Sequence, residues 1–261
     1  MVCIISPSKT MDTENESRIK KTTIPEYLDK AAHLTSILEK YERSDLSTLM
    51  KLSDKLASQT FDQYKELIKN NCKGNAPAIY SYTGEVYTGL KAIDFNPEDL
   101  IYAKDHLRIL SGLYGILRPT DGILPYRLEM ATKIQPNENQ KYLYQYWSKD
   151  ITSTLNQLIK KNKCNYLANL ASDEYMKVVN IKELAKPVIH FEFYEIKNGE
   201  KKFISFNAKR ARGMMAAFII KNQIQNPHDL KLFCEEGYYF DPAESTELNL
   251  TYILPENKNR F

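Results

Sequence analysis

Glycine is scarce in this chain of 261 residues. Only nine glycines are present, about half of the roughly 7% that is usual in globular proteins. Five of the nine lie between residues 84 and 122, namely Gly84, Gly89, Gly112, Gly115 and Gly122. Glycine adopts left-handed backbone conformations freely and lets another segment approach closely. The clustering therefore indicates an unusual backbone in that region.

Several common functional motifs are also missing. The four cysteines are far apart and form no C-x-x-C pair, which argues against a zinc ribbon or a thioredoxin-like dithiol. The phosphate-binding G-x-x-x-x-G-K-[ST], the dinucleotide-binding G-x-G-x-x-G and the metalloprotease H-E-x-x-H are absent. The four histidines are scattered along the chain. We therefore expect no intrinsic metal site and no cofactor.

Long apolar runs and an excess of one charge are lacking as well. No stretch approaches the ~20 apolar residues of a membrane span, and the run from Met1 to Ile5 is too short for the core of a signal peptide. Lysine and arginine number 36 against 33 acidic residues, a net charge of +3. This balance argues against a chain kept disordered by self-repulsion. We expect a cytoplasmic protein without a membrane partner; no pattern indicates its oligomeric state.

The chain has no internal repeat and no Gly/Ser-rich linker, so residues 1–261 are predicted to form one domain. Helical patterns separate short apolar runs, and Asn198-Gly199 predicts a hairpin between two of these runs. This alternation predicts an α/β fold, a single compact domain whose mixed sheet is surrounded by helices. Strands are expected at 2–6, 78–83, 107–113, 164–171, 187–197 and 201–207.

Helix boundaries follow from capping patterns. Thr23 and Glu26 predict a capping box before a helix over about 27–41. Asn96-Pro97 predicts the start of another helix. Apolar residues at helical spacing predict helices over 144–158 and 211–219, with Asn207 as a candidate cap of the second.

Polar groups gather at several predicted strand ends. Ser6, Lys9 and Thr10 follow the first strand, where open α/β sheets commonly bind ligands. Two hydroxyls and an ammonium group suit an oxyanion, although a polar turn with a solvated lysine is the alternative. Ser172 follows another strand, and either Ser172 or Asp173 is expected to cap the next helix. A nucleophilic role for Ser172 is not expected, because no histidine lies near it in the sequence.

Two further segments carry clustered charge. In residues 111–130, Gly112 favours close backbone approach, and Arg118, Arg127 and Glu129 provide anion-binding or ion-pairing groups. The alternative is an Arg–Glu pair that braces an irregular loop. In residues 207–213, three cations lie near a predicted helix start, where a bound anion would relieve their conflict with the helix dipole. The alternative there is a solvated basic turn.

At these segments the chain resembles the YaaA peroxide-stress family of bacterial proteins, nearly from end to end. The resemblance rests on seven ordered blocks, at residues 6–10, 53–57, 84–90, 107–119, 125–130, 169–175 and 209–213. It implies a cytosolic protein that protects cells during hydrogen peroxide stress and limits damage linked to free intracellular iron. It also implies a positively charged cleft that binds DNA, with a helix-hairpin-helix element expected at 46–68 and its turn at 57–60.

Two hypotheses follow for the cleft. In the first, the protein binds DNA phosphates through Lys9, Lys55, Arg118, Arg127, Lys209, Arg210 and Arg212. Supporting groups would be Ser6, Thr10, Gly112, Tyr114, Glu129 and Ser172. In the alternative, the same cleft is an enzyme site for a small anionic or nucleotide-like substrate. Arg118, Arg127 and Lys209 would then bind the anion, and Glu129 or Lys9 would act as acid or base. A third reading is a scaffold without a functional cleft.

Overall fold

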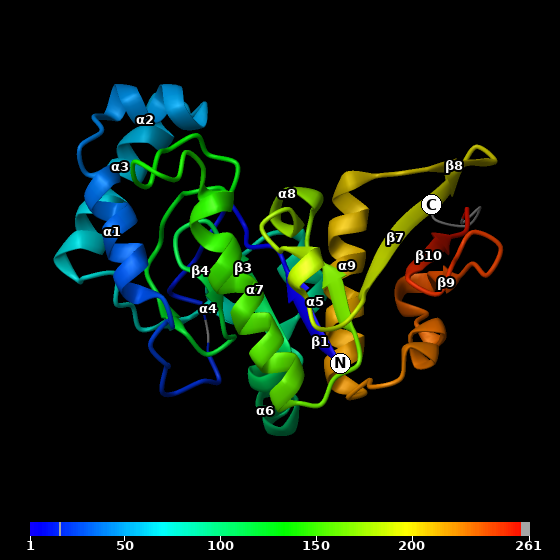
Figure 1. Ribbon diagram of the computed structural model, residues 1–261. Coiled ribbons are helices and arrows are strands. Elements are labelled where there is room, and N and C mark those ends of the chain that lie inside the picture. Colours follow the sequence, from blue (N-terminus) through cyan, green and yellow to red (C-terminus); the bar gives the residue numbers. More distant parts are fainter. Residues whose placement is uncertain (16, 257–261) are drawn as a thin grey trace.

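A mixed sheet forms the centre of the computed structural model, which describes residues 1–15 and 17–256 (Figure 1). Its strand order is β4-β3-β1-β6-β7-β10-β9, and β8 pairs with β7. A separate two-stranded sheet is formed by β2 and β5. The strands are β1 (Val2–Ile5), β2 (Ala76–Pro77), β3 (Leu107–Ser111), β4 (Gly115–Leu117), β5 (Gly122–Ile123), β6 (Leu167–Leu170), β7 (Val188–Lys197), β8 (Glu200–Lys202), β9 (Tyr239–Phe240) and β10 (Asn249–Leu254).

Strand β1 lies inside a parallel core, between β3 and β6. It pairs in parallel with β3, where Cys3 is opposite Leu107, and with β6, where Val2 is opposite Leu167. β7 and β10 continue the parallel arrangement, whereas β4, β8 and β9 are antiparallel additions. All four residues of β1 have 0% exposure. Burial on both faces explains why this strand is a continuous apolar run rather than an alternating one.

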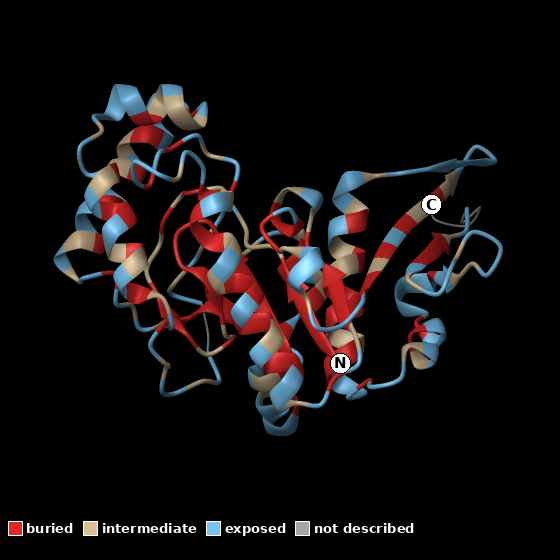
Figure 2. Ribbon diagram, viewed as in Figure 1, coloured by how far each residue is buried: buried red, intermediate tan, exposed pale blue. Residues whose placement is uncertain are grey.

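Helices cover the sheet and extend beyond its β4 edge (Figure 1). Helices α5, α6 and α9 pack together, and α9 also contacts β1, β6 and β7. Figure 2 shows the central strands buried and the outer faces of the helices exposed. The helices are α1 (Leu28–Leu38), α2 (Arg43–Met50), α3 (Asp54–Lys69), α4 (Ala78–Ser81), α5 (Glu85–Leu90), α6 (Pro97–His106), α7 (Leu143–Lys161), α8 (Asp173–Met176) and α9 (Ser205–Lys221), with short turns η1 (Ala92–Asp94), η2 (Ile181–Glu183), η3 (Pro227–Leu232) and η4 (Glu235–Gly237).

Helices α5 and α9 touch backbone to backbone. A Cβ atom added at Gly213 would lie 1.9 Å from the carbonyl oxygen of Val86, and one added at Gly89 would lie 2.0 Å from that of Arg210. Neither position leaves room for a side chain, so the two glycines set the distance between the helices. This close crossing brings the start of α5 and the start of α9 to the same end of the sheet.

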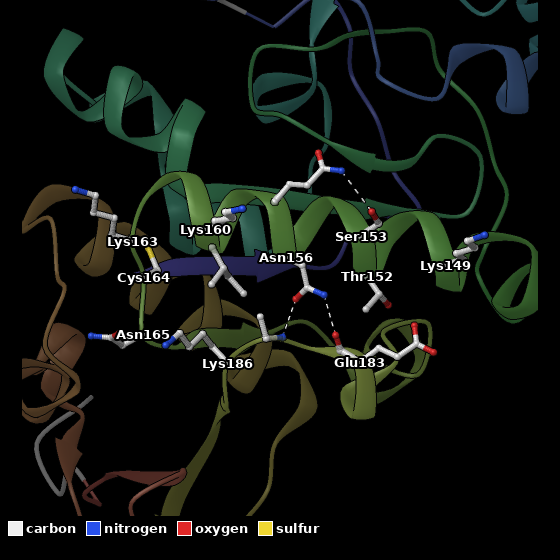
Figure 3. A pocket seen from close by; sticks show the side chains of 13 residues that line it. Lys149, Thr152, Ser153, Asn156, Lys160, Lys163, Cys164, Asn165, Glu183 and Lys186 are labelled. Carbon is white, nitrogen blue, oxygen red and sulfur yellow. Dashed lines mark hydrogen bonds between the residues drawn. The ribbon is translucent and has the colours of Figure 1, made fainter.

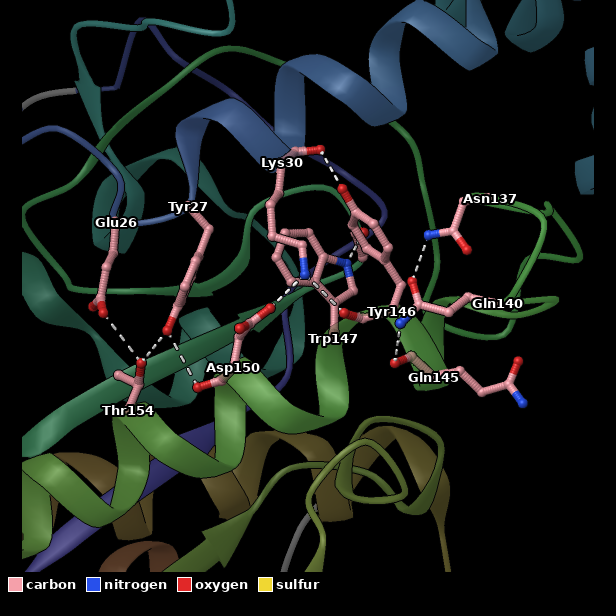
Figure 4. A network of polar contacts seen from close by, with 11 residues as sticks. Glu26, Tyr27, Lys30, Asn137, Gln140, Gln145, Tyr146, Trp147, Asp150 and Thr154 are labelled. Atoms are coloured by element: carbon pink, nitrogen blue, oxygen red, sulfur yellow. Dashed lines mark hydrogen bonds and ion pairs between the residues drawn. The ribbon is translucent and has the colours of Figure 1, made fainter.

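A polar network fastens α1 to α7 (Figure 4). The Lys30 ammonium pairs with Asp150 and lies 4.0 Å from the ring centroid of Tyr146. The Tyr27 hydroxyl is 2.6 Å from the Thr154 hydroxyl, which donates to Glu26. Cation–π and charge-assisted contacts of this kind hold two amphipathic helices in a fixed relation. The network therefore has a structural role beside the β4 edge.

The fold confirms the predicted α/β class and mixed sheet. The Asn198-Gly199 hairpin joins β7 to β8 with both residues at positive φ. Asn96 caps α6 and accepts from the backbone N–H of Asp99 at 2.8 Å. Among the described residues, no helix combines the length and the apolar composition that a membrane span needs.

Several local predictions were wrong. The strand expected at 201–207 ends at Lys202, and residues 205–207 belong to α9. Residues 78–81 form helix α4 rather than a strand. Helix α9 starts at Ser205, so Asn207 lies inside it and donates to Glu195 instead of capping it. Thr23 forms no capping box, because its hydroxyl donates to the buried Asp121 at 2.6 Å. The turn of the predicted helical hairpin is at residues 51–53, and residues 57–60 lie within α3.

Candidate functional site

A pocket of about 490 Å³ opens at the carboxyl ends of β1 and β6. This is the edge at which open parallel sheets bind their ligands. It collects residues from five separated parts of the chain: the segment after β1, the start of α5, residues 126–129, the β6–α8 junction and the start of α9. Seven of the thirteen predicted site residues line it, namely Ser6, Lys9, Arg127, Glu129, Ser172, Lys209 and Arg212.

Two serines join the strand ends beneath the pocket. The Ser172 backbone N–H donates to the Ser6 hydroxyl oxygen at 2.9 Å. The Ser6 hydroxyl in turn donates to the Ser172 hydroxyl at 3.3 Å. The Tyr87 hydroxyl of α5 donates to the Ser6 carbonyl at 3.1 Å. Ser172 is the residue before α8, but its side chain does not accept a capping hydrogen bond. Its hydroxyl is thus committed to Ser6 rather than to the helix.

Residues 126–129 form neither a helix nor a strand, and hydrogen bonds from buried hydroxyl groups hold this segment in place. The Tyr126 hydroxyl lies 2.6 Å from those of Tyr82 and Ser111, and burial raises its pKa to about 12. The hydroxyl of Tyr64, on α3, donates to the Arg127 carbonyl. The Arg127 Nε is buried and has no hydrogen-bond partner within residues 1–15 and 17–256. A buried donor of this kind costs about 1–3 kcal/mol until an acceptor reaches it.

Gly112 and Tyr114 lie under the same segment. A Cβ atom at Gly112 would be 2.2 Å from the Leu128 carbonyl oxygen, and the Gly112 carbonyl itself accepts from the Trp147 indole at 2.9 Å. The Tyr114 ring packs edge-to-face on Tyr126, with centroids 5.5 Å apart. Neither residue lines the pocket. They pack instead against the segment that carries Arg127.

The pocket carries both signs of charge. Lys9, Lys209, Arg127 and Arg212 supply four cations, and three glutamates, Glu85, Glu129 and Glu174, supply the anions. Lys9 is already paired with Glu129, its Nζ lying 2.8 Å from Oε2. Arg212 is half-buried, and this burial lowers the pKa of its guanidinium, an effect that Asp173 opposes. The free cationic character is therefore concentrated on Arg127, Lys209 and Arg212.

Four predicted residues lie elsewhere, for specific reasons. Arg118 is held by Asp121, with its NH2 group 2.8 Å from Oδ1, and it donates to the Ile24 carbonyl at 2.6 Å. Arg210 points away from the pocket lining and pairs with Glu236. Lys55 is exposed on α3, also outside that lining. Thr10 is exposed and lies outside the pocket lining. Its hydroxyl is 3.1 Å from the hydroxyl of Ser8, which does line the pocket.

Sequence patterns missed part of the pocket wall. Phe206 and Ser205 line it from the first turn of α9, and Tyr87 and Tyr175 contribute aromatic surface. Burial raises the pKa of both tyrosines well above the usual value, so they are neutral. Helical spacing would have placed residues 205, 209 and 212 on one face of the helix. That signal was lost because the helix start was predicted six residues too late.

Comparison with known proteins identifies the family of this chain. The profile of the family described as "Peroxide stress protein YaaA" matches residues 1–244. The chain belongs to the YaaA family. A UPF0246 protein of Marinomonas sp. (strain MWYL1) is 43% identical over 258 residues, covering 98% of each chain. A UPF0246 protein of Aliivibrio fischeri (strain ATCC 700601 / ES114) is 43% identical over 257 residues, covering 98% of this chain and 99% of the relative.

A second depression in this YaaA protein lies along the outer side of α7 (Figure 3). Its volume is about 800 Å³, and it is lined by Lys149, Lys160, Lys163 and Lys186. The Asn156 amide bridges its walls, donating to the Glu183 carbonyl at 2.8 Å and accepting from the Ala185 backbone at 2.8 Å. Cys164 and Asn165 place it before the start of β6, away from the strand ends that carry Ser6 and Ser172.

The described parts of the chain show no group of three or more histidine, cysteine, aspartate or glutamate side chains placed to hold a metal ion. Three cysteines, Cys3, Cys72 and Cys164, are buried, and Cys234 is exposed. The chemistry available in the pocket is therefore that of guanidinium, ammonium, carboxylate and hydroxyl groups. Such a set binds anions and can move protons.

Proposed function

We propose that this YaaA-family protein binds a small phosphate- or carboxylate-bearing ligand in the pocket, as part of the family's peroxide-stress role. The observation that carries the proposal is the convergence of Arg127, Lys209 and Arg212 on one pocket, with the Arg127 Nε buried and unpartnered among the described residues. A guanidinium recognises the oxygens of such an anion through parallel donors. An anion in this pocket would offset the three positive charges.

Size and charge both favour a small ligand. A volume of about 490 Å³ falls within the roughly 300–1,000 Å³ of small-molecule sites. Three glutamates beside the cations would repel a long polyanion but leave room for one anionic group. Of the seven cations first predicted to contact DNA, Arg118 and Arg210 are engaged in ion pairs outside the pocket.

The pocket also supports an enzymatic form of this proposal. Glu129 and Lys9 form an ion pair at its wall, and Glu174 accepts from the Ala131 backbone at 3.2 Å. A ligand anion that draws Lys9 away would free the Glu129 carboxylate as a general base.

Isothermal titration calorimetry with inorganic pyrophosphate tests anion binding. We expect wild-type protein to bind it, and Arg127→Gln to weaken binding at least tenfold, because one bidentate charge-assisted contact is lost. Arg210→Gln is the matched control, since this arginine is on α9 but outside the pocket. Equal affinity in all three proteins, or no heat at millimolar pyrophosphate, would overturn the proposal.

DNA binding is the second candidate, because some predicted cations are accessible to a large polyanion. The Lys9 side chain is 61% exposed, and Lys55 and Lys209 are also exposed. If the four pocket cations contacted phosphates, log affinity would fall with log salt with a slope of about −3 to −4. Fluorescence anisotropy with a labelled duplex over roughly 50–200 mM salt measures this slope. A flat response, or no loss in Lys9→Ala with Lys209→Ala, would exclude DNA contact through the pocket.

The family's link to iron is proposed to be indirect. The polar groups of the pocket include three glutamates but no histidine or cysteine. We therefore place the effect on iron-linked damage downstream of anion or DNA binding rather than in iron storage by this chain.

A further inference from the structure

We propose that the anion taken by the pocket is a nucleoside phosphate, with its base against Phe206 and its phosphate on Arg127 and Arg212. This inference rests on the proposed anion-binding function and adds the class of the ligand. It is carried by three kinds of surface in the same pocket: an exposed aromatic ring, a cationic cluster and carboxylates.

Phe206 provides the aromatic surface. Its side chain is 60% exposed although it lines the pocket from the first turn of α9. An exposed large apolar residue costs hydration free energy unless something covers it. A planar base is a suitable cover, because every base has a π face that stacks on an aromatic ring. Ser205, beside it, also lines the pocket and adds a hydroxyl for a base or sugar edge.

The phosphate end follows from the arginines. Arg212 lies on the same helix as Phe206, and its half-buried guanidinium lines the pocket. Arg127 comes from the opposite segment, which Tyr64, Tyr126 and Gly112 hold in place. Two guanidinium groups from different elements can bind separate oxygens of one phosphate. Arginine is better suited to this than lysine, because its donors form a fixed fork.

Carboxylates complete the match to a nucleotide. Glu85, Glu129 and Glu174 line the pocket between these groups and can accept hydrogen bonds from sugar hydroxyls. A simple inorganic anion would use the cations but would gain no hydrogen bond from these glutamates. A ligand that carries a phosphate, hydroxyls and an aromatic base has a partner for each type of group. The mixed charge of the pocket is thus expected of a nucleotide site rather than of a site for inorganic phosphate alone.

Calorimetry with adenosine monophosphate and ribose 5-phosphate separates the base from the anion. We expect the nucleotide to bind about tenfold more tightly than the sugar phosphate, which is within the range for one stacked base. Phe206→Leu should remove most of that difference and leave ribose 5-phosphate binding unchanged, whereas Phe206→Tyr should retain it. Phe203→Leu is the matched control, because Phe203 is 58% exposed on the same segment but outside the pocket.

The outcomes distinguish this inference from the function on which it rests. Equal affinity for the two ligands in wild-type protein, with binding lost in Arg127→Gln, would overturn the nucleotide and keep the anion site. Absence of binding to both ligands and to pyrophosphate would overturn both proposals. Equal losses in Phe206→Leu and Phe203→Leu would also count against the base site, because the effect would then be a general one of exposed aromatics. Circular dichroism of each variant confirms that it is folded.

Discussion

Replacing Gly112 by valine is expected to lower the free energy of unfolding by about 3 kcal/mol or more. The added Cβ would lie 2.2 Å from the Leu128 carbonyl oxygen, which is backbone and cannot rotate away. The 126–129 segment would have to move, and Arg127 would move with it. The same variant should therefore bind pyrophosphate at least tenfold more weakly. Urea unfolding followed by tryptophan fluorescence and calorimetry measures the two effects.

A control for the glycine change is Gly199→Val. Gly199 has φ of +74° in the β7–β8 hairpin, but a Cβ atom there would meet nothing within 4 Å. Its replacement should cost only the backbone strain, about 1–2 kcal/mol, and leave pyrophosphate binding intact. Gly112→Ala adds the same Cβ but none of the further atoms of valine, so it is the milder form of the test if the valine variant does not fold. A stable Gly112→Val protein with wild-type affinity would show that the glycine has no role in supporting the pocket.

Replacing Arg118 by methionine is expected to cost about 2–3 kcal/mol at neutral pH. Asp121 is 1% exposed. Its carboxylate accepts hydrogen bonds from the Arg118 backbone N–H at 2.8 Å and from the Arg118 Nε at 2.9 Å. Burial raises the pKa of Asp121 above its usual value, while Thr23 and Arg118 oppose that rise. Without the guanidinium, the pKa rises further. The variant would then hold a buried carboxylate without its main counter-charge.

The loss should depend on pH in a defined direction. With its folded-state pKa raised, Asp121 keeps its proton longer in the folded than in the unfolded protein, so stability falls as pH rises between the two values. The deficit of Arg118→Met relative to wild type should therefore be smaller at pH 4 than at pH 7. Adding Asp121→Asn should remove this pH-dependent part. An Arg118→Met protein of wild-type stability that loses affinity for DNA would instead restore Arg118 as a phosphate contact.

Much of the site could be predicted because strand ends are visible in the sequence. Ser6 and Ser172 follow buried apolar runs, and the parallel pairing of β1 with β6 places those ends side by side. Arg118 could not be placed by the same reasoning, since an arginine beside a glycine-rich segment looks the same whether it faces a cleft or a buried acid. The nearest available signal was Asp121, three residues further on. Its burial, which decides the matter, is a tertiary property.

Helical elements were harder to locate than strands. The run at 78–83 is short and apolar, and such a run suits a buried strand and a buried helical turn equally well. Residues 57–60 are polar and carry no glycine, yet they continue α3 because Ala57, Thr60 and Tyr64 share its buried face. The chain reverses instead at Lys51, a lysine in the left-handed conformation. Non-glycine residues adopt that conformation too rarely for the sequence to reveal it.

The central position of β1 has a consequence for how the protein is made. Its neighbours in the sheet are β3 and β6, more than a hundred residues later in the chain. During synthesis the first strand stays unpaired until β3 has emerged. Its other edge stays open until β6 has emerged, and the Ser6–Ser172 junction can close only after that. Pairings of such long sequence separation form slowly and leave apolar segments open to aggregation in the meantime. The strand that anchors the pocket is thus the first to be synthesised, yet it gains its second partner only after β6 has been made.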